Sequence, residues 1–420
     1  MNNWREVKLG DIADIGTGKT NRQDETKNGA YPLFDRSSVV KRSDKYLFDC
    51  KAVIIPGEGK EFLPRYFSGK FDLHQRAYRI TSKSEASVKT KFLYYYLNQH
   101  RDYWERVAVG TTVKSLRLHS FTDFPVKLPP IEEQKAIVHV LGMLDDKIEL
   151  NQQMNETLES MAQAIFKDWF IDFGPTRRKM EGATDLDVIL GGLLRTSEKA
   201  REIVDLFPSA LTDNSLPKKW KYTTVGERFD VRIGRTPPRK ESWHFTKQTT
   251  GVPWLSIRDL ADCGVFVHQT AERLTGCSIK NCRIPLVMAG TVLVSFKLTV
   301  GRVSIAECMM TTNEAIAHLN STDRSPMPYF TYCWMKNFDY SSLGSTSSIA
   351  TAVNSKSIRK IPFPEFGVDV ENEFGLLIKP IFELILINAK QNRILLATRD
   401  LILPNFISGK IHSHELRMIS

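Results

Sequence analysis

The sequence predicts an α/β fold class: two mixed α/β lobes, each ending in a long helix, related by an internal repeat. Two alignments of the chain with itself indicate this. Residues 4–20 (WREVKLGDIADIGTGKT) align without a gap with residues 220–236 (WKYTTVGERFDVRIGRT), at an offset of 216. Residues 374–406 align with residues 137–169 at an offset of 237. We therefore expect a pseudo-two-fold repeat in which a lobe followed by a helix occurs twice.

The two offsets and the composition divide the chain into five segments. The difference between the offsets, 21 residues, requires insertions in the second lobe. The polar connector between the halves is expected to contain one short helix. The expected segments are lobe 1 (1–130), a central helix (131–173), the connector (174–219), lobe 2 (220–367) and a C-terminal helix (368–410).

The central helix is the clearest prediction. Pro129-Pro130 ends a strand-like stretch, and residues 131–170 then continue without proline. Apolar residues recur at heptad spacing in both long segments, except for one layer of asparagines, which in a coiled coil fixes register. An antiparallel coiled coil is expected; the alternative is a helix packed on its own lobe with the asparagines in water. The candidate helix-pairing residues are Leu144, Ile148, Asn151, Asn155, Leu158, Ile381, Ile385, Asn388, Asn392 and Leu395.

The start of the second helix is less clear from the sequence. Gly375 and Pro380 both disfavour a helix interior. The helix is therefore expected either to kink at this point or to begin at Pro380, as a first-turn residue.

Short elements are expected inside each lobe. CKAVIIPGEG and AGTVLVSF have the composition of buried strands, and KFLYYYLNQH and MPYFTYCWMKNF that of short aromatic helices. The run Tyr94–Tyr96 is expected in the core rather than stacked on bases. A Gly/Ser/Thr loop precedes the last strand of each lobe, at residues 110–115 and 344–357.

The segment DIGTGKTNR resembles the end of a nucleotide-binding P-loop. The P-loop template places a glycine five residues before Gly18, where this chain has Ala13. The repeat also replaces Lys19 by Arg235 and continues with two prolines. A loop that presents one cation and one hydroxyl to a phosphate backbone tolerates these changes, whereas a P-loop does not.

Composition limits the class of protein. The chain has 420 residues, 42% of them hydrophobic and 25% charged, which suits a globular protein with two or three cored domains. No apolar run approaches the roughly 20 residues of a membrane span, and the first residues have no signal-peptide character. The six cysteines are scattered, and Cys277 and Cys282 lack a second pair for zinc. Reduced cysteines, no metal and a cytoplasmic location are expected.

The net charge of +10 is unevenly distributed. Residues 1–130 carry a net charge of +8 and residues 220–367 a net charge of +7, whereas residues 131–173 carry −6. Two basic lobes separated by an acidic segment are typical of a protein whose lobes contact a polyanion.

Several motifs resemble the specificity subunits of type I restriction-modification enzymes, over essentially the whole length. LPPIEEQKAIVHVLGMLDDKIELNQQMNETLESMAQAIFKDWF is similar to the central conserved helix of that family, and FGPTRRKMEG with LFPSALTDNSLPKKW to its connector. LLATRDLILPNFISGKI is similar to its C-terminal signature, and VPWLSIRDL to its second recognition domain.

The resemblance implies that the lobes are two tandem target recognition domains. Each would recognise one half of a bipartite sequence in double-stranded DNA, and the helices would set the spacer and dock two methyltransferase subunits. It implies no catalysis and no cofactor in this chain: S-adenosylmethionine, ATP and Mg would be bound by the methyltransferase and restriction subunits. The alternative from the residues alone is a self-contained adenine methyltransferase or a P-loop ATPase.

Residues that contact DNA need amide or cationic side chains on loops, because such groups bind base edges and phosphates. For each candidate the other reading is an exposed charge or a helix cap. The candidates are Lys19, Thr20, Arg22, Gln75, Arg76, Lys114, Arg235, Thr236, Arg239, Arg258, Asn313, Asn354 and Lys356.

Overall fold

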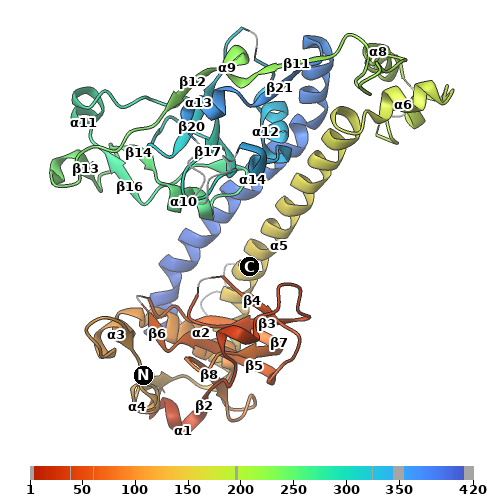
Figure 1. Ribbon diagram of the computed structural model, residues 1–420. Coiled ribbons are helices and arrows are strands. Elements are labelled where there is room, and N and C mark those ends of the chain that lie inside the picture. Colours follow the sequence, from red (N-terminus) through yellow and green to blue (C-terminus); the bar gives the residue numbers. More distant parts are fainter. Residues whose placement is uncertain are drawn as a thin grey trace. The chain divides into compact units, whose positions relative to one another are not determined.

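The computed structural model describes residues 4–37, 39–59, 61–193, 197–323, 325–343 and 354–410, without the side chain of residue 22. The chain divides into two compact units: the first ends at Leu150 and resumes at Gln391, and the second covers Asn151–Lys390. Each unit holds one α/β lobe and part of each of two long helices, α5 (Ile131–Phe170) and α14 (Val368–Ile407) (Figure 1). The predicted fold class, two α/β lobes with long helices, is confirmed.

The first unit is built on a six-stranded sheet in the order β2-β8-β5-β7-β3-β4. Its central strand β5 contains the buried run Val53-Ile54-Ile55, whose β-branched side chains suit a strand covered on both faces. Helix α2 covers one face, where Phe92 and Leu93 pack with Val53 and Ile80. The sheet strands are β2 (Ala13–Thr17), β3 (Tyr31–Phe34), β4 (Lys41–Ser43), β5 (Phe48–Pro56), β7 (Arg65–Leu73) and β8 (Ala77–Ser82).

Smaller elements complete the first unit. Two-stranded sheets pair β1 with β10 and β6 with β9. The predicted helix at 91–100 corresponds to α2, in which Tyr95 and Tyr96 are buried, as expected for core residues. The remaining elements are β1 (Arg5–Lys8), α1 (Leu9–Ile12), η1 (Arg22–Asp24), β6 (Glu58–Gly59), α2 (Thr90–Gln99), α3 (Arg101–Val107), β9 (Lys114–Ser115), α4 (Leu118–Thr122) and β10 (Pro125–Leu128).

The second unit contains a five-stranded sheet, β12-β20-β17-β18-β15, and a four-stranded sheet, β13-β16-β14-β19. A two-stranded sheet pairs β11 with β21. The strands are β11 (Lys221–Thr224), β12 (Asp230–Ile233), β13 (Phe245–Thr246), β14 (Val252–Leu255), β15 (Phe266–Val267), β16 (Glu272–Leu274), β17 (Val292–Ser295), β18 (Val303–Ala306), β19 (Thr311–Thr312), β20 (Ile316–Asn320) and β21 (Pro362–Glu365). The helices are α9 (Val225–Arg228), η2 (Ser242–His244), α10 (Ile257–Asp262), α11 (Gly276–Asn281), α12 (Pro328–Asn337), η3 (Tyr340–Leu343) and α13 (Ser355–Arg359).

The first four strands of the two large sheets correspond in order and direction. Val53 lies opposite Ile80 in the first unit, and Val292 lies opposite Leu319 in the second, which gives an offset of 239 for both strands. The offset between β2 and β12 is only 216. The extra residues of lobe 2 are therefore inserted between β12 and β17. This stretch contains α10, β16 and α11.

Helices α5 and α14 have 40 residues each. The residue numbers at which they begin differ by the predicted offset of 237, and so do those at which they end. Of the two alternatives for the start of the second helix, the one that begins it at Pro380 is wrong, because α14 starts at Val368 and continues through Gly375 and Pro380. Gly375 has a packing role: a Cβ atom there would lie 2.7 Å from Met327 Sδ. The glycine allows this helix to approach the segment before α12.

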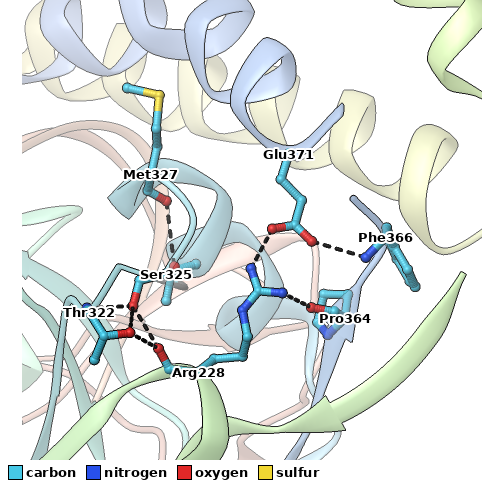
Figure 2. Close-up of polar contacts among 8 residues, drawn as sticks. Arg228, Thr322, Ser325, Met327, Pro364, Phe366 and Glu371 are labelled. Carbon is cyan, nitrogen blue, oxygen red and sulfur yellow. Dashed lines mark hydrogen bonds and ion pairs between the residues drawn. The ribbon is translucent and has the colours of Figure 1, made fainter. Parts of the chain in front are cut away.

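A buried ion pair joins the first turn of α14 to lobe 2 (Figure 2). The Arg228 guanidinium donates to Glu371 Oε2 at 2.5 Å and to the Pro364 carbonyl at 3.1 Å. The other Glu371 oxygen accepts the Phe366 backbone N–H at 3.0 Å. Burial raises the pKa of Glu371, although the Arg228 hydrogen bond and charge act against this.

The connector is more ordered than the sequence predicts. Its described residues, 174–193 and 197–219, form three helices instead of one: α6 (Gly174–Met180), α7 (Leu186–Ile189) and α8 (Glu198–Leu206). Ile203 and Val204 of α8 lie in the same core cluster as Trp169 at the end of α5. In the described part of the chain, no helix is both long and apolar enough to span a membrane.

Candidate nucleic-acid interface

The Gly-Lys-Thr loop of lobe 1 is held against strand β7. A Cβ atom on Gly18 would lie 1.7 Å from the Leu73 carbonyl oxygen, so only glycine allows this approach. Thr20 is 3% exposed and its hydroxyl donates to the buried Asp72 carboxylate at 2.6 Å. Lys19, between them, is exposed. The glycine and the threonine therefore fix the loop, and Lys19 is the side chain that it presents.

Lobe 2 repeats the close approach with different partners. A Cβ atom on Gly234 would lie 2.2 Å from the Asn313 carbonyl oxygen, and the Arg235 backbone N–H donates to the Thr312 carbonyl at 2.9 Å. Arg235 is exposed, like Lys19, and its guanidinium donates to the Cys282 carbonyl at 2.8 Å. The loop shape is thus shared, and in both lobes it displays one cation.

Two predicted residues of lobe 1, Gln75 and Arg76, line an open hollow of about 660 Å³ beside this loop. Both are exposed, and Arg76 donates to Glu58 at 2.7 Å. The sequence reasoning missed the other lining residues, although Asn21 and Gln23 follow the loop directly. They are Asn21, Gln23, Asp35, Arg36 and His74.

The imidazole of His74 faces this hollow. Partial burial lowers the pKa of His74, and the charges of Arg76 and Arg36 act in the same direction, whereas Asp35 acts against it. The ring is therefore neutral near pH 7, and because Nδ1 already accepts the Arg76 backbone N–H at 3.0 Å, Nε2 is the nitrogen that can donate. A neutral imidazole among amides and cations can form hydrogen bonds with base edges as well as with phosphates.

The corresponding part of lobe 2 has a different charge pattern. Arg239 forms an ion pair with Glu272 at 2.7 Å and lies over the rings of Phe245 and Trp254. The Thr236 hydroxyl donates to Glu314. Burial alone would raise the pKa of Glu314, but the Thr236 hydrogen bond and the nearby cations together lower it.

Asn313 begins the turn that carries Glu314, at the position of His74 in lobe 1. Its backbone N–H donates to the Leu255 carbonyl at 2.9 Å, as that of His74 does to the Phe34 carbonyl. The Asn313 side chain accepts from the Ala315 N–H at 3.1 Å. The structure therefore brings Arg235, Thr236 and Asn313 together at adjoining turns.

The remaining candidates are spread over other elements. Lys114 lies on β9 opposite Gly59 of β6, next to the Glu58 that binds Arg76. Asn354 caps α13 by accepting from the Lys356 and Ser357 N–H groups, and Lys356 and Arg258 are exposed on α13 and α10. The side chain of Arg22, and residues 344–353 of the second Gly/Ser/Thr loop, lie outside the described residues.

The helix-pairing residues form a seam with a polar layer. In the second unit, the Asn388 amide donates to Asn155 Oδ1 at 2.9 Å, and the Asn155 amide donates to the Ile385 carbonyl at 3.2 Å. In the first unit, the Asn392 amide donates to the Ile148 carbonyl at 3.1 Å. Ile148, Asn151, Ile385, Asn388 and Asn392 are buried, whereas Leu144, Asn155, Leu158, Ile381 and Leu395 are half-buried.

The direction of this pairing follows from contacts inside each unit. In the first unit, Asp145 binds Arg399 at 2.9 Å, while Ile148 meets Asn392. In the second, the rings of Phe166 and Phe374 lie 5.4 Å apart. Higher numbers on α5 pair with lower numbers on α14, so the helices run antiparallel.

Comparisons with known proteins agree with this arrangement. Residues 1–160 match the model of the type I restriction modification DNA specificity domain. The chain is 24% identical to the type I restriction enzyme HindI specificity subunit of Haemophilus influenzae, over 98% of this chain and 100% of that one. It is 25% identical to the MjaIX specificity subunit of Methanocaldococcus jannaschii, over 78% and 71% of the two chains.

A solved structure has the same fold. The type I restriction-modification S subunit from M. genitalium matches with a TM-score of 0.53 at 16% identity, over 96% of each chain. The family match, the full-length relatives and the two lobes with paired helices all point to one group of proteins. The chain belongs to the specificity subunits of type I restriction-modification systems, the non-catalytic component that gives such a DNA-binding complex its sequence specificity.

Proposed function

We propose that each lobe recognises one half of a bipartite DNA target, and that α5 and α14 set the spacer between the halves. The observation that carries this proposal is the repeated loop, in which a glycine packed on a strand presents Lys19 in lobe 1 and Arg235 in lobe 2. A phosphate contact at equivalent points of two lobes would position both on a duplex, and the differing neighbours would supply sequence preference.

The contact set that we propose keeps six residues of the sequence list and adds two that line the hollow beside the loop. The Thr20 hydroxyl is buried on Asp72, so we exclude it. Lys19, Gln75 and Arg76 remain for lobe 1, together with His74 and Asn21. Arg235, Arg239 and Asn313 remain for lobe 2.

Two methyltransferase subunits would dock on the long helices. Met143 and Leu150 of α5 are 52% and 51% exposed, seven residues apart. Ile387, Ile394 and Leu401 of α14 are 58–72% exposed at the same spacing. Exposed apolar side chains in a heptad pattern are typical of a surface that a partner helix covers. S-adenosylmethionine, ATP and Mg would be bound by the methyltransferase and restriction subunits. The complex would act in the cytoplasm.

Exchange of residues 220–367 for the matching segment of a relative tests the proposal. We expect one half of the methylated sequence to change while the other half and the spacer length stay the same, because base contacts are local to a groove. Sequencing of methylated adenines in cells that also contain the methyltransferase partner measures both half-site sequences and the spacer length. The reciprocal exchange of residues 1–130 is the control. Changes in both halves from one exchange would contradict independent recognition.

A further inference from the structure

The turn between β17 and β18 carries an unusually exposed apolar side chain. Leu298 is 88% exposed, more than any other large hydrophobic side chain in the described ranges. Its φ angle is 64°, in the left-handed region that residues other than glycine, asparagine and aspartate seldom adopt. Both features are unfavourable for a leucine that has only a structural role.

The backbone around Leu298 forms a strained turn. The Thr299 N–H donates to the Lys297 carbonyl at 2.7 Å, which closes a three-residue turn with Leu298 at its centre. With a positive φ at the central residue, this is the rare form of the γ-turn. A bulky residue persists in such a conformation only when its surroundings fix it, and strain of this kind concentrates at ligand-binding sites.

The surroundings do fix this turn. The buried Ser295 side chain donates to the Thr299 carbonyl at 2.5 Å and accepts from the Arg302 N–H at 2.9 Å. A Cβ atom on Gly301 would lie 2.6 Å from the Tyr340 ring, so the turn is packed closely on η3. Leu298 is therefore held outward on a rigid support.

The turn lies beside the candidate interface of lobe 2. The Phe296 N–H donates to the Ala315 carbonyl at 2.9 Å, in the turn that begins at Asn313. The exposed Lys297 contributes to lowering the pKa of Glu314, which accepts from Thr236. Leu298 thus projects from the same group of turns that carries Arg235, Thr236 and Asn313.

We propose that Leu298 is a wedge that inserts between two adjacent base pairs of the half-site that lobe 2 recognises. This rests on the proposed function, because it assumes that lobe 2 contacts DNA. Rigid apolar side chains beside cations are a known means of unstacking a base step and bending a duplex. Lys297 next to the wedge would neutralise phosphate at that step.

Lobe 1 has no equivalent side chain. The Gly57 N–H donates to the Arg76 carbonyl at 2.8 Å, as that of Phe296 does to Ala315, and Leu298 therefore corresponds to Gly59. Gly59 also has a positive φ, of 145°. Glycine adopts a positive φ without strain, so the leucine of lobe 2 is an addition, and we expect the wedge to distort only the half-site that lobe 2 recognises.

The test uses the full chain assembled with its methyltransferase subunits, on duplexes that contain the target identified by adenine-methylation sequencing. 2-Aminopurine replaces single bases in either half-site, except the methylated adenines and the bases next to them, because its fluorescence rises when stacking is lost and a methyltransferase also unstacks its target base. We expect the wild type to raise the fluorescence at one step of one half-site only. Leu298→Ala keeps the strained backbone but removes the wedge; it should abolish the rise and weaken target binding about tenfold.

Leu63→Ala is the matched control, since Leu63 is a 39% exposed leucine between β6 and β7 of lobe 1; it should change neither quantity. Leu298→Gly should also abolish the rise while increasing the thermal midpoint by about 2–4 °C over Leu298→Ala, because glycine relieves the strain. Unchanged fluorescence and affinity in Leu298→Ala would overturn the wedge. The wedge would also be overturned if the Leu298→Ala chain failed to assemble with the methyltransferase subunits in the absence of DNA. A wild-type complex without any target preference would instead contradict the proposed function, and the wedge with it.

Discussion

Lobe 1 and lobe 2 share strand order, turn geometry and a packed glycine, yet they use different chemistry at equivalent positions. Where lobe 2 joins α14 through the buried Arg228–Glu371 pair, lobe 1 has Ile12 and Gln134. The Gln134 amide donates to the Pro129 carbonyl at 2.9 Å and accepts from the Lys89 N–H at 2.9 Å. The comparison teaches that the lobe-to-helix joint needs a buried, fully hydrogen-bonded side chain on the helix, and that charge is optional.

The ion pair gives the largest predicted effect. Arg228→Ala leaves the Glu371 carboxylate buried without its cation and should destabilise the second unit by about 3–5 kcal/mol. The double replacement Arg228→Ile with Glu371→Gln introduces the residues of lobe 1 and should recover most of that loss. Denaturant unfolding followed by tryptophan fluorescence measures both. A double variant as unstable as the single one would show that the joints of the two lobes are not interchangeable.

The central sheets differ in their response to acid. His318 on β20 is fully buried with Thr312 Oγ1 at 2.7 Å from Nε2, whereas the corresponding residue of β8 is Arg79. Burial, assisted by the charge of Arg232, lowers the pKa of His318 to about 4. The unfolded chain binds this proton near pH 6.5, so stability is complete above that pH and falls as the pH drops towards 4, by roughly 3 kcal/mol.

His318→Gln removes this titration. Unfolding midpoints at pH 7.5 and pH 4.5 should therefore differ less in the variant than in the wild type. Arg79→Gln, in lobe 1, should leave the pH dependence as it is, because arginine stays protonated throughout this range. Equal pH dependence in wild type and His318→Gln would contradict the assignment.

The two threonines of the repeated loop should differ in their effect on stability. The buried Asp72 accepts from Thr20 at 2.6 Å, from Ser43 at 2.9 Å and from the Leu73 N–H at 2.9 Å. Thr20→Val removes one of these bonds and should cost about 2 kcal/mol. Thr236→Val breaks a bond to the exposed Glu314 and should cost less than about 0.5 kcal/mol. Thermal unfolding compares them, and equal costs would mean that Thr20 does not fix its loop.

The smallest effect concerns the two displayed cations. Lys19→Ala and Arg235→Ala should each reduce the slope of log binding constant against log salt concentration by about one unit. Each should also weaken binding to the same extent for every DNA sequence. Lys135→Ala on α5 is the control, since Lys135 already pairs with Glu132 outside the lobes. Titration of a labelled duplex at several salt concentrations gives the slopes. An unchanged slope in the double variant, or saturable ATP binding lost in Lys19→Ala, would contradict phosphate contact.

The sequence predicted best what depends on periodic, local patterns. The bounds of α5 follow from Pro129-Pro130 and from forty residues without another proline. The start of α14 was ambiguous in the sequence because Gly375 reads as a helix breaker, whereas in the structure the missing side chain leaves room for Met327, 48 residues earlier in the chain. The sequence predicted one short helix in the connector and not three, because short amphipathic segments give weak patterns until a core is present.

The candidate interface could be predicted only in outline. Lys19 and Arg235 follow from the repeat, but the burial of Thr20 depends on Asp72, 52 residues away. Leu298 has no sequence pattern, since its significance lies in a backbone angle and in exposure. The exclusion of a P-loop, by contrast, needed only the missing glycine and the arginine in the repeat.

Pro380 has a mechanical consequence. It lacks the N–H that would bond the Leu376 carbonyl, so α14 is one hydrogen bond short in this turn. Helix α5 has Met143 at the corresponding place and loses no bond. Under a bending load, α14 is therefore more compliant than α5 between Leu376 and Pro380, and Pro404 has the same effect one turn from the end of α14.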